Sequence, residues 1–229
     1  MKTIGLIGGM SPQSTVFYYK TLNSLVNDRY GGHASAKILL HSVNFAETHA
    51  KQTAGEWDGL GHQLAEAARG LERAGADIIA LATNTMHKCA PSVEAATPLP
   101  FLHIADATAM ALTSQGRKRP ALLGTRFTMM ERFYIDRLND HGLEAAIPNE
   151  TARGDIDRTI FDELVRGIVQ EDSRERYVEI VRDLKMIGAD SVILGCTEIG
   201  MLLNHGNSPL PPFDTAFIHC QSLISAALS

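Results

Sequence analysis

The chain has 229 residues, of which 45% are hydrophobic and 21% charged, and it carries a formal net charge of −5. This length is enough for one large domain or for two lobes that each hold a core. The negative charge and the absence of a dense run of Lys or Arg argue against a nucleic-acid surface, and no apolar run approaches the roughly 18 to 20 residues that a membrane helix needs.

Short apolar runs alternate with amphipathic stretches along the whole chain, which is typical of parallel strands joined by helices. In the first half, the pattern predicts strands at Thr3–Gly8, Lys37–Val43, Asp77–Ala82 and Pro100–Ile104. It also predicts two helices, one that follows the first strand and ends near Asn27, and one that spans Trp57–Ala74. In the second half, it predicts strands at Ala121–Gly124, Glu144–Pro148 and Ser191–Gly195, and helices at Thr128–His141, about Ile156–Gln170, Arg174–Ile187 and Phe217–Leu228. The sequence therefore predicts an α/β fold with parallel sheets.

Two segments resemble one another and indicate an internal duplication. Gly75–Thr85 and Gly188–Glu198 both open with Gly-Ala-Asp, continue through a short apolar strand and end in a small polar cluster. A gapless overlay places Thr83 opposite Cys196. The alternative is that any two strand–helix units share glycine and aliphatic residues.

The N-terminus and the cysteines indicate the compartment. The chain enters a strand-like segment too early for a signal peptide. Its cysteines, Cys89, Cys196 and Cys220, show no Cys-x-x-Cys spacing, and its nine histidines show no His-x-x-x-His spacing. Neither a disulfide framework nor a metal site is expected, so we expect a reducing cytoplasm and no metal.

Ligands of open parallel sheets bind beyond the carboxyl ends of the strands, where this chain carries small polar residues. The Gly8-Gly9 turn lacks the spacing of a dinucleotide loop, and no Gly-Lys-Ser/Thr phosphate loop is present. A tight turn and a ligand contact remain open for these glycines, while a bound nucleotide is disfavoured.

Cys196 is the sharpest candidate for chemistry. It follows a predicted strand and precedes a helix expected to begin near Thr197, so the helix dipole should lower the pKa of its thiol and favour thiolate. The alternative is a small buried apolar cysteine, which describes Cys89 and Cys220 well. Thr83 is of interest only because it matches Cys196. His87 lies four residues beyond Thr83, and two interpretations of it remain open: a structural histidine, or a side chain that faces the same cleft as Thr83.

The segments Thr83–His87 and Gly195–Glu198, with the opening Leu6–Met10 and Leu123–Thr125, closely resemble the aspartate/glutamate racemase family over essentially the whole chain. The resemblance implies two pseudo-symmetric Rossmann-like lobes, here 1–103 plus 209–229 and 104–208, with the active site in the cleft between them. It implies racemisation without pyridoxal phosphate or any other cofactor, by two cysteines that act on opposite faces of the α-carbon. It also implies a small acidic amino acid as the partner and a homodimer.

The chain departs from this pattern because Thr83 stands where typical members have the first cysteine, although a subgroup carries Thr-Asn-Thr. By the resemblance, Cys196 acts on the L-enantiomer. A hydroxyl is far less acidic than a thiol and is a poor resting base, so we expect L-biased catalysis, with a relay through His87 as a conjecture. By the family's pattern, the expected substrate contacts are Met10, Gln52, Asn84, Thr85, Thr125, Thr128, Arg166, Thr197 and Glu198.

The cation that holds the side-chain carboxylate is left open among Lys51, Arg126 and Arg166, each of which is otherwise an ordinary surface charge. Two other functions also remain open. One is a single-cysteine relative that decarboxylates a malonate-type substrate or isomerises maleate. The other is an amino-acid-binding protein without catalysis.

Overall fold

The computed structural model describes all residues, 1–229, and the chain forms two compact units. The first unit comprises Met1–Ile104 and His219–Ser229, and the second comprises Ala105–Ile218. Residues 209–218, which are predicted to lie in the first lobe, belong to the second unit. The chain crosses between the units at Ile104 and again at Ile218.

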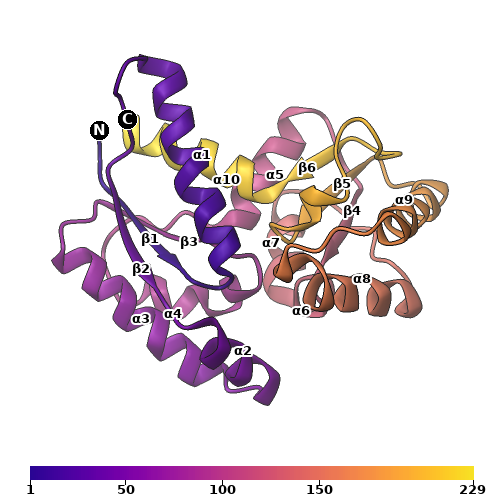
Figure 1. The fold of residues 1–229 in the computed structure, drawn as a ribbon, viewed down its shortest axis with the longest axis horizontal. Helices are drawn as coiled ribbons and strands as arrows, with labels where there is room; N and C mark the ends of the chain where they lie inside the picture. The colour runs from indigo at the N-terminus through magenta and orange to yellow at the C-terminus, as the bar shows by residue number, and fades with distance from the viewer. The chain divides into compact units, whose positions relative to one another are not determined.

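The first unit is built on a three-stranded parallel sheet in the order β2-β1-β3. Its elements are β1 (Ile4–Gly8), α1 (Pro12–Tyr30), β2 (Ile38–Ser42), α2 (Phe45–Ala54), α3 (Trp57–Arg73), β3 (Ile78–Leu81), the 3-10 helix η1 (Thr85–Cys89) and α4 (Ala90–Glu94). Helix α1 lies on one face of this sheet, and α3 lies on the other (Figure 1). The sheet is thus covered on both faces, as expected for parallel strands.

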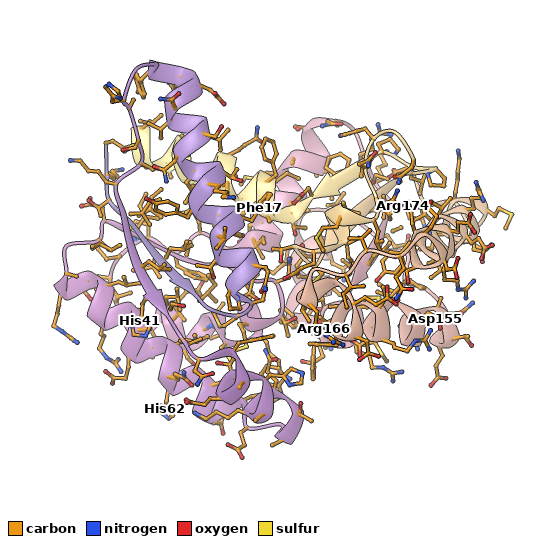
Figure 2. All side chains as sticks on the ribbon, in the orientation of Figure 1. Phe17, His41, His62, Asp155, Arg166 and Arg174 are labelled. Carbon is orange, nitrogen blue, oxygen red and sulfur yellow. The ribbon has the colours of Figure 1, made fainter.

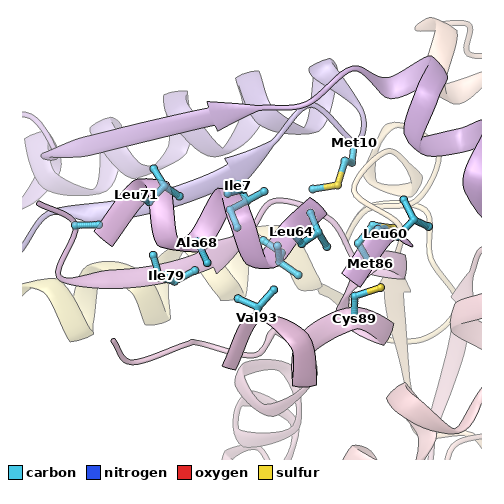
Figure 3. Packing of buried hydrophobic residues seen from close by; sticks show 13 residues of the cluster. Ile7, Met10, Leu60, Leu64, Ala68, Leu71, Ile79, Met86, Cys89 and Val93 are labelled. Atoms are coloured by element: carbon cyan, nitrogen blue, oxygen red, sulfur yellow. The ribbon is translucent and has the colours of Figure 1, made fainter. Parts of the chain in front are cut away.

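The two faces of β1 explain how the central strand is buried. Alternate residues of a strand point to opposite faces, and a Cβ on Gly8 would lie 2.6 Å from the Thr15 hydroxyl of α1. Ile7 points the other way, into an apolar cluster with Leu60 and Leu64 of α3 (Figure 3). Every residue of β1 is buried, so the carboxyl end of this strand is held firmly from both sides.

The second unit repeats the plan with a parallel sheet in the order β4-β5-β6. Its elements are α5 (Ile104–Ser114), β4 (Pro120–Gly124), α6 (Arg126–Met130), α7 (Arg132–Asp140), α8 (Glu150–Asp162), the 3-10 helix η2 (Leu164–Arg166), α9 (Glu171–Met186), β5 (Ser191–Gly195), the 3-10 helix η3 (Ile199–Met201) and β6 (Pro212–Asp214). The last helix, α10 (Thr215–Leu228), begins in the second unit and from His219 onward belongs to the first. The α/β class with two parallel-sheet lobes is thereby confirmed.

Two predicted strands are reduced to single bridges. In Pro100–Ile104, only Phe101 pairs, with Ile79. Pro100 has no N–H to donate, and the Leu102 carbonyl also bonds to the His219 ring. In Glu144–Pro148, only Ala146 pairs, with Ala121.

The predicted helix Thr128–His141 is instead two helices, α6 and α7, separated by Glu131 in an extended conformation. Met129 and Tyr134 are both fully buried. Five residues along one continuous helix would place them about 140° apart around its axis, so the break allows both to reach the core.

Candidate functional site

In the first unit, the loops after β1 and β3 lie beside one another because these strands are parallel neighbours. Ser14, in the first turn of α1, donates a hydrogen bond from its hydroxyl to the carbonyl of Ala82 at 2.8 Å. This bond ties the loop after β1 to the residue that precedes Thr83. Thr83, Asn84 and Thr85 are all buried.

Two predicted contact residues from other parts of the first unit reach the same edge of the sheet. Gln52 of α2 is buried, and its side-chain amide donates to the sulfur of Met86 at 2.8 Å. Met86 and Met10 belong to the same apolar cluster (Figure 3). The structure thus brings Met10 and Gln52 to the segment that begins at Thr83.

The turn after β1 is a tight structural turn. Gly9 has a φ of +88°, and a Cβ there would lie 2.2 Å from the carbonyl oxygen of Val43. Only glycine fits this close approach in this backbone region. The Gly9 N–H donates to the Thr15 hydroxyl at 2.7 Å.

His87 is a buried residue whose two ring nitrogens both have partners. Nδ1 lies 2.8 Å from the carbonyl oxygen of Thr83, and Nε2 accepts a hydrogen bond from the Ile104 N–H at 3.2 Å. A ring held in this way cannot readily pass a proton to the Thr83 hydroxyl. The conjectured relay through His87 therefore lacks support in the geometry of this unit.

In the second unit, the loops after β4 and β5 are also neighbours, with Gly124 paired to Gly195. Thr125 caps α6, and its hydroxyl lies 3.2 Å from that of Thr128. A Cβ on Gly195 would lie 3.2 Å from the Thr128 methyl group. The structure thus places Thr125 and Thr128 against the end of the strand that leads into Cys196.

Cys196 forms a compact polar group with the two residues that follow it. Its thiol donates to Oε2 of Glu198 at 3.0 Å, and the Thr197 hydroxyl donates to the same oxygen at 2.5 Å. Cys196 and Glu198 are both buried, and Thr197 is partly exposed. One carboxylate oxygen therefore holds both donors.

The expectation that the helix dipole lowers the pKa of Cys196 is wrong. The helix that follows is the three-residue 3-10 helix η3, which is too short for a substantial dipole. Burial raises the pKa of the thiol well above its ordinary value, and the Glu198 carboxylate raises it further. Cys196 at rest is thus a protonated thiol that donates to a carboxylate.

Sequence reasoning missed one residue that influences this thiol, Asp157, and one that the thiol influences, Tyr177. Asp157 of α8 adds to the rise in the pKa of Cys196, and it accepts a hydrogen bond from the Arg126 N–H at 2.8 Å. Tyr177 of α9 is fully buried and donates to the Ile156 carbonyl. Burial is the main cause that raises its pKa, and Cys196 is the next. Neither residue lies in a motif, so no local pattern could have found them.

The candidate cations are less well placed than the polar residues. Arg166 lies exposed on η2, where its guanidinium donates to the Asp162 carbonyl at 3.3 Å (Figure 2). Arg126 is also exposed. Lys51 is partly buried and donates to the side chain of Gln63 at 3.2 Å.

All three cysteines are free and buried. Burial raises the pKa of Cys89 to about 11. No group of three or more His, Cys, Asp or Glu side chains is arranged to hold a metal ion. None of the helices is both long enough and apolar enough to cross a membrane.

Comparison with known proteins gives a consistent result. Residues 7–223 match the model of the Asp/Glu/hydantoin racemase family. A Yersinia pestis protein provisionally identified as an Asp/Glu racemase is 45% identical, with a TM-score of 0.94 and full coverage of both chains. An aspartate racemase homologue from Pyrococcus horikoshii is 36% identical, with a TM-score of 0.88 and full coverage of both chains. The broad-specificity amino-acid racemase RacX of Bacillus subtilis is 25% identical over 99% of this chain and 98% of its own length.

The chain therefore belongs to the Asp/Glu/hydantoin racemase family. As a member of that family it is an isomerase, and the predicted racemase class is confirmed.

Proposed function

We propose that this family member racemises aspartate and glutamate without a cofactor, with Cys196 removing the α-proton of the L-enantiomer and Thr83 in the opposing acid/base position. The observation that carries the proposal is the hydrogen bond from the Cys196 thiol to Glu198 at 3.0 Å. It supplies a buried thiol with an adjacent proton acceptor. A nucleophile or base paired with an orienting acceptor is the usual arrangement for proton-transfer chemistry in proteins.

Proton transfer between Cys196 and Glu198 avoids placing two negative charges side by side in a buried site. A buried thiolate beside a buried carboxylate would place two negative charges together, which is strongly unfavourable. If the thiol proton moves to Glu198 as the thiolate forms, the pair keeps one negative charge throughout. The Thr197 hydroxyl, which donates to the same oxygen, can remain in place during this transfer. The positive ammonium group of a bound amino acid further favours the charged thiolate.

Thr83 is the weak member of the pair of acid/base groups. Its hydroxyl is far less acidic than a thiol, so it is a poor resting base, although it can donate a proton to a carbanion. Removal of the α-proton by Cys196 is therefore easier than removal from the opposite face. The expected result is L-biased chemistry in which exchange at the L face outruns inversion.

The proposed substrate contacts come from both units, from residues at or near the carboxyl ends of their strands. Met10, Gln52, Asn84 and Thr85 belong to the first unit, and Thr125, Thr128, Arg166, Thr197 and Glu198 belong to the second. Short polar side chains and backbone N–H groups suit the carboxylates of an acidic amino acid, and donors aimed at the α-carboxylate would stabilise the developing carbanion. Arg166 is the proposed partner of the side-chain carboxylate.

We also propose a reducing compartment, the cytoplasm, and a homodimer. A base that works as a thiol must stay reduced, and all three cysteines are free. Family resemblance favours the dimer. Neither nucleic acid nor a membrane is a proposed partner.

The decisive test is α-proton exchange. Each enantiomer of aspartate and glutamate is incubated separately with the protein in D₂O, and loss of the α-proton signal is followed by NMR. We expect exchange from the L-enantiomers that disappears in Cys196→Ala. Cys220→Ala, which removes a fully buried thiol in α10, is the matched control and should keep its exchange.

The alternatives give different results in the same assay. A binding protein would retain aspartate without exchanging its α-proton, whereas a decarboxylase or a maleate isomerase would convert malonate-type acids or maleate. Exchange that survives in Cys196→Ala would overturn the proposed mechanism.

A further inference from the structure

The first unit buries a cluster of aromatic and imidazole rings next to Thr83. His87, His103, His219 and Tyr18 are at most 5% exposed. The His87 ring lies 4.5 Å from that of His103 and 5.9 Å from that of His219, measured between centroids. The Tyr18 ring lies 5.7 Å from that of His219. Burying several imidazoles costs free energy unless each ring nitrogen has a hydrogen-bond partner.

The hydrogen bonds fix the tautomers of two of these rings. A backbone N–H can only donate, so Nε2 of His87 accepts from Ile104, and its Nδ1–H donates to the Thr83 carbonyl. In His219, Nε2–H donates to the Leu102 carbonyl at 2.9 Å, and Nδ1 accepts from the Tyr18 hydroxyl at 2.8 Å. Burial lowers the pKa of His219 to about 4. Both rings are therefore neutral and fully engaged.

Two of the residues that His87 contacts lie where the chain passes between the two units. Ile104 is the last residue of the first unit before the chain passes into the second, and His219 is the first residue after it returns. One ring thus contacts the Thr83 peptide, the outgoing crossing through Ile104 and the returning crossing through His219.

We propose that His87 is a positioning residue, whose ring fixes the Thr83 peptide to the two chain crossings and so sets where Thr83 presents its hydroxyl. The proposal rests on the proposed function, in which Thr83 is the opposing acid/base group. The Thr83 carbonyl and side chain share one backbone unit, so a bond at the carbonyl restricts the direction of the hydroxyl. A misplacement of about 1 Å in a reacting group can lower a rate by about two orders of magnitude.

The geometry separates His87 from a catalytic relay. Its Nδ1–H is directed at a carbonyl oxygen rather than a hydroxyl, and its Nε2 is directed at a backbone N–H. It acts on the chemistry only through the position of Thr83. This role makes a prediction about inversion that differs from the one about exchange.

In the proposed mechanism, inversion needs proton transfer on both faces of the α-carbon, by Cys196 and by Thr83. Incorporation of deuterium into the L-enantiomer needs proton transfer by Cys196 alone. The ratio of D-aspartate formed to deuterium incorporated into L-aspartate in D₂O therefore reports on the Thr83 side. His87→Gln can keep an acceptor near Nε2 but loses the donor to Thr83, and we expect it to lower this ratio about fivefold or more, the loss of one ordinary hydrogen bond. His87→Asn can keep a donor near Nδ1 and should hold the ratio within about twofold of the wild type.

The matched control is Tyr18→Phe, which removes a buried hydrogen bond from the same cluster without touching the Thr83 peptide. We expect it to lower the melting temperature and to leave the ratio unchanged. If His87→Gln folds and keeps the wild-type ratio, or if all three variants lower the ratio equally, the proposal is overturned. A wild type that shows no exchange overturns the proposed function instead, and this proposal with it.

A measurement without turnover keeps the proposal testable if His87→Gln does not fold. Two-dimensional ¹⁵N NMR of the wild-type imidazoles should show the Nδ1–H tautomer for His87, and the Ile104 amide should be protected from hydrogen exchange. An Nε2–H tautomer or a rapidly exchanging Ile104 amide would contradict the bonding on which the proposal stands.

Discussion

Acid should destabilise the first unit through His219. The ring is fully buried between Tyr18 and the Leu102 carbonyl, and burial lowers its pKa from 6.5 to about 4. A histidine with a lowered pKa takes up its proton more readily in the unfolded chain, so stability is present above pH 6.5 and is lost as the pH falls towards 4. This drop in pKa corresponds to a fall of about 3 kcal/mol in the free energy of unfolding between neutral pH and the low-pH limit. Such a fall is a large part of the stability of an ordinary domain.

The assay is urea unfolding at several pH values between 7 and 4, for the wild type and for His219→Gln. Gln keeps a donor for the Leu102 carbonyl but has no charge to gain, so its stability should fall with pH by about 3 kcal/mol less than that of the wild type. Burial raises the pKa of Asp214, and a raised carboxyl pKa acts in the opposite direction, with stability lost as the pH rises. That effect is common to both proteins and cancels in the difference. Parallel losses in wild type and variant would refute the assignment of acid sensitivity to His219.

Three further predictions concern the proposed chemistry. Cys196→Ser should reduce exchange from L-aspartate by about 10²- to 10⁴-fold, measured by NMR in D₂O, because a hydroxyl replaces the proposed base; unchanged exchange would contradict this role. Thr83→Cys should raise the ratio of inversion to L-face exchange by about tenfold, measured by chiral chromatography alongside deuterium content, since a thiol is the better acid and base; an unaltered ratio would show that Thr83 is not the second group. Glu198→Gln should lower the maximal exchange rate by about 100-fold, because the variant lacks the proton acceptor, and should move the rising limb of the pH profile to lower pH, because one cause of the raised thiol pKa is gone; a rising limb at the wild-type pH would count against the pairing.

Strands and their polar ends are predictable from this sequence because they depend on short-range patterns. The apolar run Ser191–Gly195 is found with its bounds unchanged, and Cys196 is the residue directly after the end of this strand. Helix α2 was missed although its start carries a local signal. Asn44 caps it, with its side chain accepting from the Ala46 N–H and donating to Glu47, and this pairing resembles a capping box.

The chemistry of individual side chains depends on contacts that no local pattern encodes. The sequence predicts a lowered thiol pKa for Cys196 because it predicts a helix directly after this residue, but the direction of the shift is set by burial and by the Glu198 carboxylate. The orientation of Glu198 towards the thiol follows from how η3 leaves β5, which the letters Cys-Thr-Glu do not specify. The engagement of His87 is equally non-local, because its acceptor bond comes from Ile104, 17 residues along the chain.

Thermodynamics sharpens what the replacement of a thiol by Thr83 can mean. Two enantiomers in water have equal free energy, so kcat/KM must be the same in both directions, and a better kcat for the L-enantiomer must be matched by a higher KM. A poor base at Thr83 therefore cannot move the equilibrium towards either product. In the proposed mechanism its effect falls on partitioning: once Cys196 has removed the α-proton, we expect the carbanion to be returned to L more often than it is protonated on the Thr83 side. Excess L-face exchange over inversion is thus the kinetic signature of this residue, and the position of Thr83 that His87 holds should set its size.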